Sequence, residues 1–279
     1  MEELALDIRR AVGKYEPIKV DDLTLYPIKV ENYYEFLMAK PSIDFMQQSL
    51  PVNLMSIPLL DAYFRIDMGL VDGMKPNGLF SSALLCLALA LRLMPHGTAE
   101  EQVRKFQIVP DDVNDPKVLK CIKFVLNGEE MHTITPIQFG NLRPIIAAQN
   151  GIELISETAN PELIQAERDM QENKAPKLDI DLESLISATA LIARVDEKEI
   201  YDWAILKMNN RLESAKRVID YMTCGIGEAQ GTKWNGGNPV PHPWFERTNE
   251  KKAGVIALES FANGQGMDAF NNANQTITT

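Results

Sequence analysis

Cysteine, histidine and long apolar runs are all scarce in this chain of 279 residues. Its three cysteines, Cys86, Cys121 and Cys224, are widely spaced and form no CxxC pair. This excludes a disulfide framework or a zinc knuckle and suits a reducing cytosol. The most apolar run spans only 79–91, whereas a bilayer-spanning helix needs roughly 20 residues. We therefore expect a buried core helix there, no membrane association, and a cytoplasmic protein, because the acidic start MEELALDIRR does not resemble a signal peptide.

The chain also has fewer basic than acidic residues and lacks common catalytic motifs. The formal net charge of −11 argues against a general affinity for nucleic acid, because backbone phosphates select basic surfaces. The GxSxG, Walker and HExxH patterns do not occur, and CGIGEAQG at 224–231 follows a helix, as a glycine helix stop does. The histidines His96, His132 and His242 have no partner at metal-ligand spacing. We expect no enzyme activity, metal or cofactor; a composite site assembled in three dimensions is the alternative.

The apolar periodicity predicts a mainly α protein with a small β-hairpin element (α+β). Asn127-Gly128, flanked by β-branched and aromatic residues, predicts a hairpin over about 117–135. A helix closed by Asn150-Gly151 follows, with 136–140 as a turn leading in and Pro144 kinking or dividing it. Proline-punctuated helices are expected at about 31–39, 42–49, 56–69 and 79–94.

The chain divides into four parts by composition. These are an N-terminal helical domain with the hairpin (1–158), a charged linker (159–180), an αα-hairpin (181–224) and an extended Pro/Gly-rich arm with a polar, disordered tail (225–279). In the αα-hairpin, Asp181 caps the first helix, and Asp196 with Glu199 forms a capping box for the second. The second helix carries one apolar stripe, which includes Tyr201, Met208 and Met222.

The arm contains an aromatic segment, GTKWNGGNPVPHPWFER at 231–247. Its prolines favour an extended path, and its rings are of the type that dominates contact energies. Two uses remain open: the segment binds a partner, or it straps the arm to the protein's own helices. The candidate partner-binding residues are Trp234, His242, Trp244, Phe245, Tyr201, Met208 and Met222.

Three stretches resemble tail assembly chaperones and related proteins from the tail-morphogenesis region of phages and prophages of Gram-positive bacteria. The stretches are LYPIKVENYYEFL (25–37), LNGEEMHTITPIQFGNLRPIIAAQNGIEL (126–154) and GGNPVPHPWFERTNEKKAGVIALESFANGQGM (236–267). They cover about a quarter of the chain, and none is a catalytic motif. The chain is longer than many such chaperones, which leaves a structural role in the virion tail or baseplate as the alternative.

The resemblance implies a non-enzymatic factor that binds the tape-measure protein or the tail tube protein and keeps it soluble; a homo-oligomer is also possible. Flexible methionine side chains suit such binding, although they also fill gaps in ordinary cores. The methionines considered are Met38, Met46, Met55, Met68, Met74, Met208 and Met222. A helix–turn–helix DNA reader at 181–222 is a further alternative, but its acidic surroundings favour simple helix packing.

Overall fold

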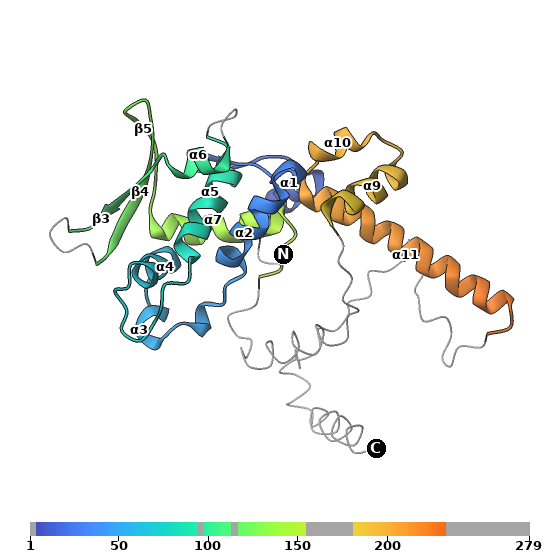
Figure 1. Cartoon of the computed structure of the whole chain (residues 1–279), viewed down its shortest axis with the longest axis horizontal. Coiled ribbons are helices and arrows are strands. Elements are labelled where there is room, and N and C mark those ends of the chain that lie inside the picture. The colour runs from blue at the N-terminus through green and yellow to red at the C-terminus, as the bar shows by residue number, and fades with distance from the viewer. Residues whose placement is uncertain (1–3, 94–97, 113–116, 155–180, 233–279) are drawn as a thin grey trace, which may run out of the picture. The chain divides into compact units, whose positions relative to one another are not determined.

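The computed structural model describes residues 4–93, 98–112, 117–154 and 181–232 (Figure 1). The fold is mainly helical with small antiparallel sheets, which confirms the predicted fold class. Its elements are α1 (Leu6–Lys14), β1 (Ile18–Val20), β2 (Leu23–Leu25), the 3-10 helix η1 (Val30–Asn32), α2 (Tyr33–Asp44), the 3-10 helix η2 (Gln47–Ser49), α3 (Val52–Met55), α4 (Leu59–Asp67), α5 (Leu79–Leu91), α6 (Ala99–Val103), β3 (Phe106–Pro110), β4 (Leu119–Leu126), β5 (Glu129–Ile134), α7 (Pro136–Gln149), α9 (Leu182–Ala193), α10 (Glu197–Tyr201) and α11 (Ile205–Ala229).

The chain forms two compact units. Unit 1 comprises 1–157 and 179–216, and unit 2 comprises 158–178 and 217–279. The sequence prediction treated 181–224 as a part of its own, yet most of that region belongs to the same unit as the N-terminal domain. The predicted linker, 159–180, lies outside the described residues.

Helix α5 is the centre of the unit 1 core, as its apolar sequence predicts. Ten of its side chains are buried, and it packs against α2, α4 and α6. Its first turn is held by Asp67, whose carboxylate accepts hydrogen bonds from the backbone amides of Gly78 and Phe80 at 2.9 and 2.8 Å. Such caps satisfy amides that have no partner within the helix.

The hairpin predicted at 117–135 is present as β4 and β5, joined by Asn127 and Gly128 at φ 53° and 86°. Both positive φ angles are those a type I′ turn requires. The structure adds a third strand, β3, which pairs antiparallel with β4 and packs the ring of Phe106 edge to face against that of Phe124. In Figure 1 this sheet lies at the left edge of the drawing. The sequence analysis missed β3, because only Phe106–Ile108 alternate between apolar and polar before Val109 and Pro110 end the pattern.

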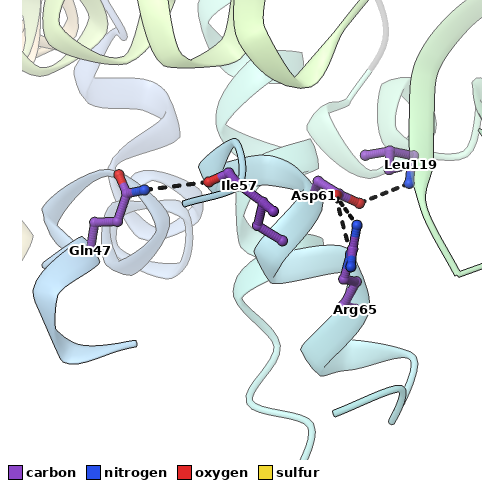
Figure 2. A network of polar contacts seen from close by, with 5 residues as sticks. All are labelled: Gln47, Ile57, Asp61, Arg65 and Leu119. Carbon is purple, nitrogen blue, oxygen red and sulfur yellow. Dashed lines mark hydrogen bonds and ion pairs between the residues drawn. The ribbon is translucent and has the colours of Figure 1, made fainter. Parts of the chain in front are cut away.

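A buried carboxylate joins the sheet to the helices (Figure 2). Asp61 on α4 is 4% exposed; one oxygen accepts from the Leu119 backbone amide of β4 at 2.8 Å, and the other accepts from Arg65 at 2.8 and 3.1 Å. Nearby, the Gln47 amide donates to the carbonyl groups of Met55 and Ile57. The two side chains fix α4 and the turn before it.

Several predicted boundaries are wrong, for reasons visible in the structure. Residues 136–140 are not a turn: α7 begins at Pro136, because Thr135 and Gln138 form a reciprocal capping box. Helix α7 also runs through Pro144 without dividing. Asp181 caps α9 as predicted, whereas Asp196 accepts from the amide of Lys198, and no reciprocal box with Glu199 forms.

The predicted second helix of the αα-hairpin is two helices, α10 and α11, separated at 202–204. The backbone there pairs with the segment before α2. The Val30 amide donates to the Trp203 carbonyl, and the Ile205 amide donates to the Ile28 carbonyl, both at 2.9 Å. This pairing uses backbone groups that a continuous helix would need for its own ladder.

Gly225 does not end α11, contrary to the prediction. The helix continues to Ala229, and Gly231 takes the left-handed conformation at φ 93°. The Thr232 amide then donates back to the Gly227 carbonyl at 2.9 Å, as in a Schellman end. The extended arm therefore cannot begin at 225, as the sequence analysis had it.

We expect replacement of Asp61 by alanine to lower the free energy of unfolding by about 2–4 kcal/mol, because Leu119 and Arg65 both lose a partner in a buried setting. Urea denaturation measures the change. Asp72→Ala, at an exposed position, is the control and should change it by less than about 0.5 kcal/mol. Equal effects of the two substitutions would contradict the anchoring role of Asp61.

Asn150→Ala should cost about 1–3 kcal/mol, because the buried amide of Ile28, 3.0 Å from the Asn150 side-chain oxygen, would lose its acceptor. Asn53→Ala, at an exposed site on α3, controls for the loss of an asparagine. If thermal and urea denaturation of the Asn150 variant matched wild type, the hydrogen bond would contribute nothing to stability.

Candidate partner-binding surface

Helix α2 has one buried and one exposed apolar face. Phe36, Ala39 and Ile43 are buried, on the helix that packs against α5. The opposite face carries Tyr34 (55% exposed), Leu37 (45%) and Met38 (66%), followed by the exposed Pro41. These four positions follow the i, i+3, i+4, i+7 pattern of one helical face. We call Tyr34, Leu37, Met38 and Pro41 the α2 stripe.

Pro41 lies inside α2, although the sequence analysis placed a break there. The helix continues because its last carbonyl groups receive donors from other elements. Arg143 on α7 donates to the carbonyls of Ile43 and Phe45, and the Tyr63 hydroxyl donates to that of Ser42 at 2.8 Å. These bonds offset the cost of proline within a helix.

Proline has no amide hydrogen, so the carbonyl of Leu37, four residues before Pro41, receives no helical donor. Leu37 and Pro41 are both exposed, so the α2 stripe combines its four apolar side chains with one missing bond in the helical hydrogen-bond ladder.

Tyr34 links the stripe to the start of α9. Burial of its hydroxyl raises the pKa of Tyr34, and the carboxylates of Glu183 and Asp181 raise it further, whereas a backbone hydrogen bond from Leu182 acts in the opposite direction. Interaction with Tyr201, at the end of α10, raises the pKa of Tyr34 by a smaller amount. The Tyr34 end of the stripe therefore lies beside two carboxylates and near Tyr201.

The sequence-predicted site residues do not form one site. Tyr201 is exposed and lies near Tyr34, and Met222 is exposed on the unit 2 part of α11. Met208 was predicted to bind a partner at the surface. It is instead fully buried, because the first turns of α11 pack into the unit 1 core. Trp234, His242, Trp244 and Phe245 lie outside the described residues.

The methionines divide between core and surface. Met208 is in the core, and Met46 and Met74 are half-buried. Among those considered in the sequence analysis, the exposed ones are Met38, Met55, Met68 and Met222; Met131 on β5 is exposed as well. Met38 belongs to the α2 stripe, which the sequence analysis did not identify. The i, i+3, i+4, i+7 spacing of the stripe is present in the sequence. The sequence analysis ended one helix before Pro41 and therefore did not connect the four positions.

A shallow cavity of about 240 Å³ lies between α3 and the segment after α4, lined by Pro51, Asn53, Leu54, Arg65, Leu70, Val71 and Asp72. Small-molecule sites typically have volumes of roughly 300–1,000 Å³ and convergent polar groups. Here the guanidinium of Arg65 is already bound to Asp61. This cavity is a weaker candidate than the α2 stripe.

Within the described ranges, no three or more His, Cys, Asp or Glu side chains cluster as a metal would require. No helix in that part of the chain is both long and apolar enough to cross a membrane. Burial raises the pKa of the Cys86 thiol to about 12, which keeps it protonated and unreactive at neutral pH.

The chain matches no protein-family model, and neither the curated proteins nor the solved structures contain a match to it. The α2 stripe is thus the best candidate site on its own geometry.

Met208 and Met222 offer a matched pair for testing which part of α11 is core. Met208→Ala should lower the free energy of unfolding by about 2–5 kcal/mol, because it opens a cavity in a buried cluster. Met222→Ala should change it by less than about 0.5 kcal/mol. Chemical denaturation of both variants measures the difference, and similar losses would contradict this division of α11.

Proposed function

We propose that the protein binds an amphipathic helix of a partner protein on the α2 stripe, as a non-enzymatic assembly chaperone or adaptor. The observation that carries this proposal is the exposed apolar face of a helix whose other face is buried in the core. Monomeric proteins seldom expose adjacent large apolar side chains without a use for them. A helix face with i, i+3, i+4, i+7 spacing can pack against the apolar face of another helix.

The chemistry of the stripe suits partners of varied sequence. Met38 is unbranched and polarisable, so it can repack against different side chains. Tyr34 combines a flat apolar ring with a hydroxyl, a combination enriched at protein interfaces.

The charge near the stripe favours a basic partner. Glu183 and Asp181 lie close enough to Tyr34 to raise its pKa, and the whole chain carries a net charge of −11. This field speeds the association of positively charged partners and keeps the free protein soluble. We therefore expect an amphipathic helix with lysine or arginine beside its apolar face.

The resemblance of 25–37 to tail assembly chaperones suggests which partner this is. That stretch includes Tyr34 and Leu37 of the stripe. We propose that the partner is a tape-measure protein or a tail tube protein, held soluble in the bacterial cytoplasm until the tail assembles.

Co-expression with the tape-measure protein of the same genome tests this proposal. The double substitution Leu37→Asp with Met38→Asp should reduce the soluble fraction of the partner at least about tenfold, because it places two charges in an apolar contact. The matched control is Val52→Asp with Met55→Asp, which places the same charges on the exposed apolar side chains of α3. This control should leave the soluble fraction of the partner unchanged. Circular dichroism should show both variants folded.

Unchanged partner solubility in the α2 variant would show that the stripe is not the binding surface. A wild-type chain that never improves the solubility of either candidate partner would reject the chaperone role. Retention of the protein in purified particles, measured by mass spectrometry, would favour the structural alternative.

A further inference from the structure

The part of α11 in unit 2 has an exposed apolar face of its own. Ile219, Met222 and Ile226 are 59%, 60% and 57% exposed. Their spacings of three and four residues place them on one side of the helix. We call these three residues the α11 stripe. It shares no residue with the α2 stripe and plays no part in the function proposed above.

The α11 stripe continues a heptad pattern that starts at the beginning of the helix. Met208 and Leu212 precede it in the same register, at alternating steps of four and three residues with Ala215 between them. Leu212, Ile219 and Ile226 then occupy one core position of the heptad, and Met208, Ala215, Met222 and Ala229 occupy the other. β-Branched residues at the first of these positions are typical of two-stranded coiled coils.

The beginning of this pattern is already used within the protein. Met208 is fully buried, and Leu212 packs against the core of unit 1. The pattern does not stop there, because the three residues of the α11 stripe repeat it while exposed to solvent. This row of apolar heptad positions, the seam, is buried at one end and exposed along the rest of the helix. A second helix packed along the exposed part would bury it as well.

The charges on this part of α11 indicate what that second helix is. From Val218 on, the heptad positions beside the seam hold Val218, Thr223, Gly225 and Gln230, none of which is charged; the charged Lys216 holds such a position just before the unit 2 part of the helix. The charged side chains, Arg217, Asp220 and Glu228, fall at the remaining positions, away from the seam. In coiled coils, charges at the heptad positions that flank the core decide which partner helix is preferred. An uncharged margin lets two identical helices meet without like-charge repulsion.

We propose that the α11 stripe pairs with the same stripe of a second copy of this chain, so that the protein forms a dimer through a short coiled coil. Three exposed side chains per copy give an interface below the roughly 1,200 Å² of standard stable complexes. The dimer is therefore weak and depends on protein concentration.

Sedimentation velocity of the full chain between about 5 and about 500 μM tests this, because weak dimers populate in that range. Wild type should shift from monomer to dimer. Ile219→Asp and Ile226→Asp should each weaken the dimer at least about tenfold. Ser214→Asp is the control: it puts the same charged residue at an exposed α11 position off the seam, and dimerisation should persist.

Circular dichroism checks that α11 stays helical in these variants. If Ile219→Asp unfolds the helix, Met222→Gln replaces it, because glutamine is a good helix former and still removes an apolar seam residue. A wild-type chain that stays monomeric at about 500 μM overturns the proposal, and so does a dimer that persists in the seam variants. A monomer whose thermal stability falls in the seam variants would show that the chain covers this face itself, which also overturns it.

Discussion

The hydrogen bonding of one extended segment, Leu25–Val30, holds unit 1 together. Residues from three separate parts of the chain bind its backbone groups. Residues at the end of α5 bind the Tyr26 amide and the Pro27 carbonyl. Asn150, after α7, binds the Ile28 amide, and Trp203, before α11, binds the Val30 amide. A buried amide or carbonyl without a partner costs as much as a lost hydrogen bond. Each neighbouring element is therefore positioned by the need to satisfy this segment.

This constraint also sets the position of the α2 stripe. Helix α2 follows the segment directly, through η1, and its far end is held by Arg143 and Tyr63. Lys29 binds Asp202 at 2.6 Å; the contact raises the pKa of Lys29 and lowers the pKa of Asp202, so both stay charged at neutral pH. With both ends fixed, the apolar side chains of α2 that face outward stay between 45% and 66% exposed.

Two apolar faces on one chain can serve two different purposes because their surroundings differ. The α2 stripe ends beside carboxylates near Tyr34, which favours a basic partner. The positions beside the α11 stripe are uncharged from Val218 on, which fits the proposed pairing with an identical helix.

The sequence by itself determined the features that depend on neighbouring residues. These include the mainly helical class, the buried helix at 79–91, the Asn127-Gly128 hairpin and the Asp181 cap, because periodicity, turn geometry and capping act within a few residues. Only the tertiary structure decided where long-range bonds outweigh local preference. In the tertiary structure, α2 continues through Pro41 and α10 is separate from α11. Met208 is buried, whereas Met222, Leu37 and Met38 are exposed. The physical reason is that each outcome depends on a donor, acceptor or packing surface more than 12 residues away along the chain, as the 100-residue separation of Arg143 from Ile43 illustrates.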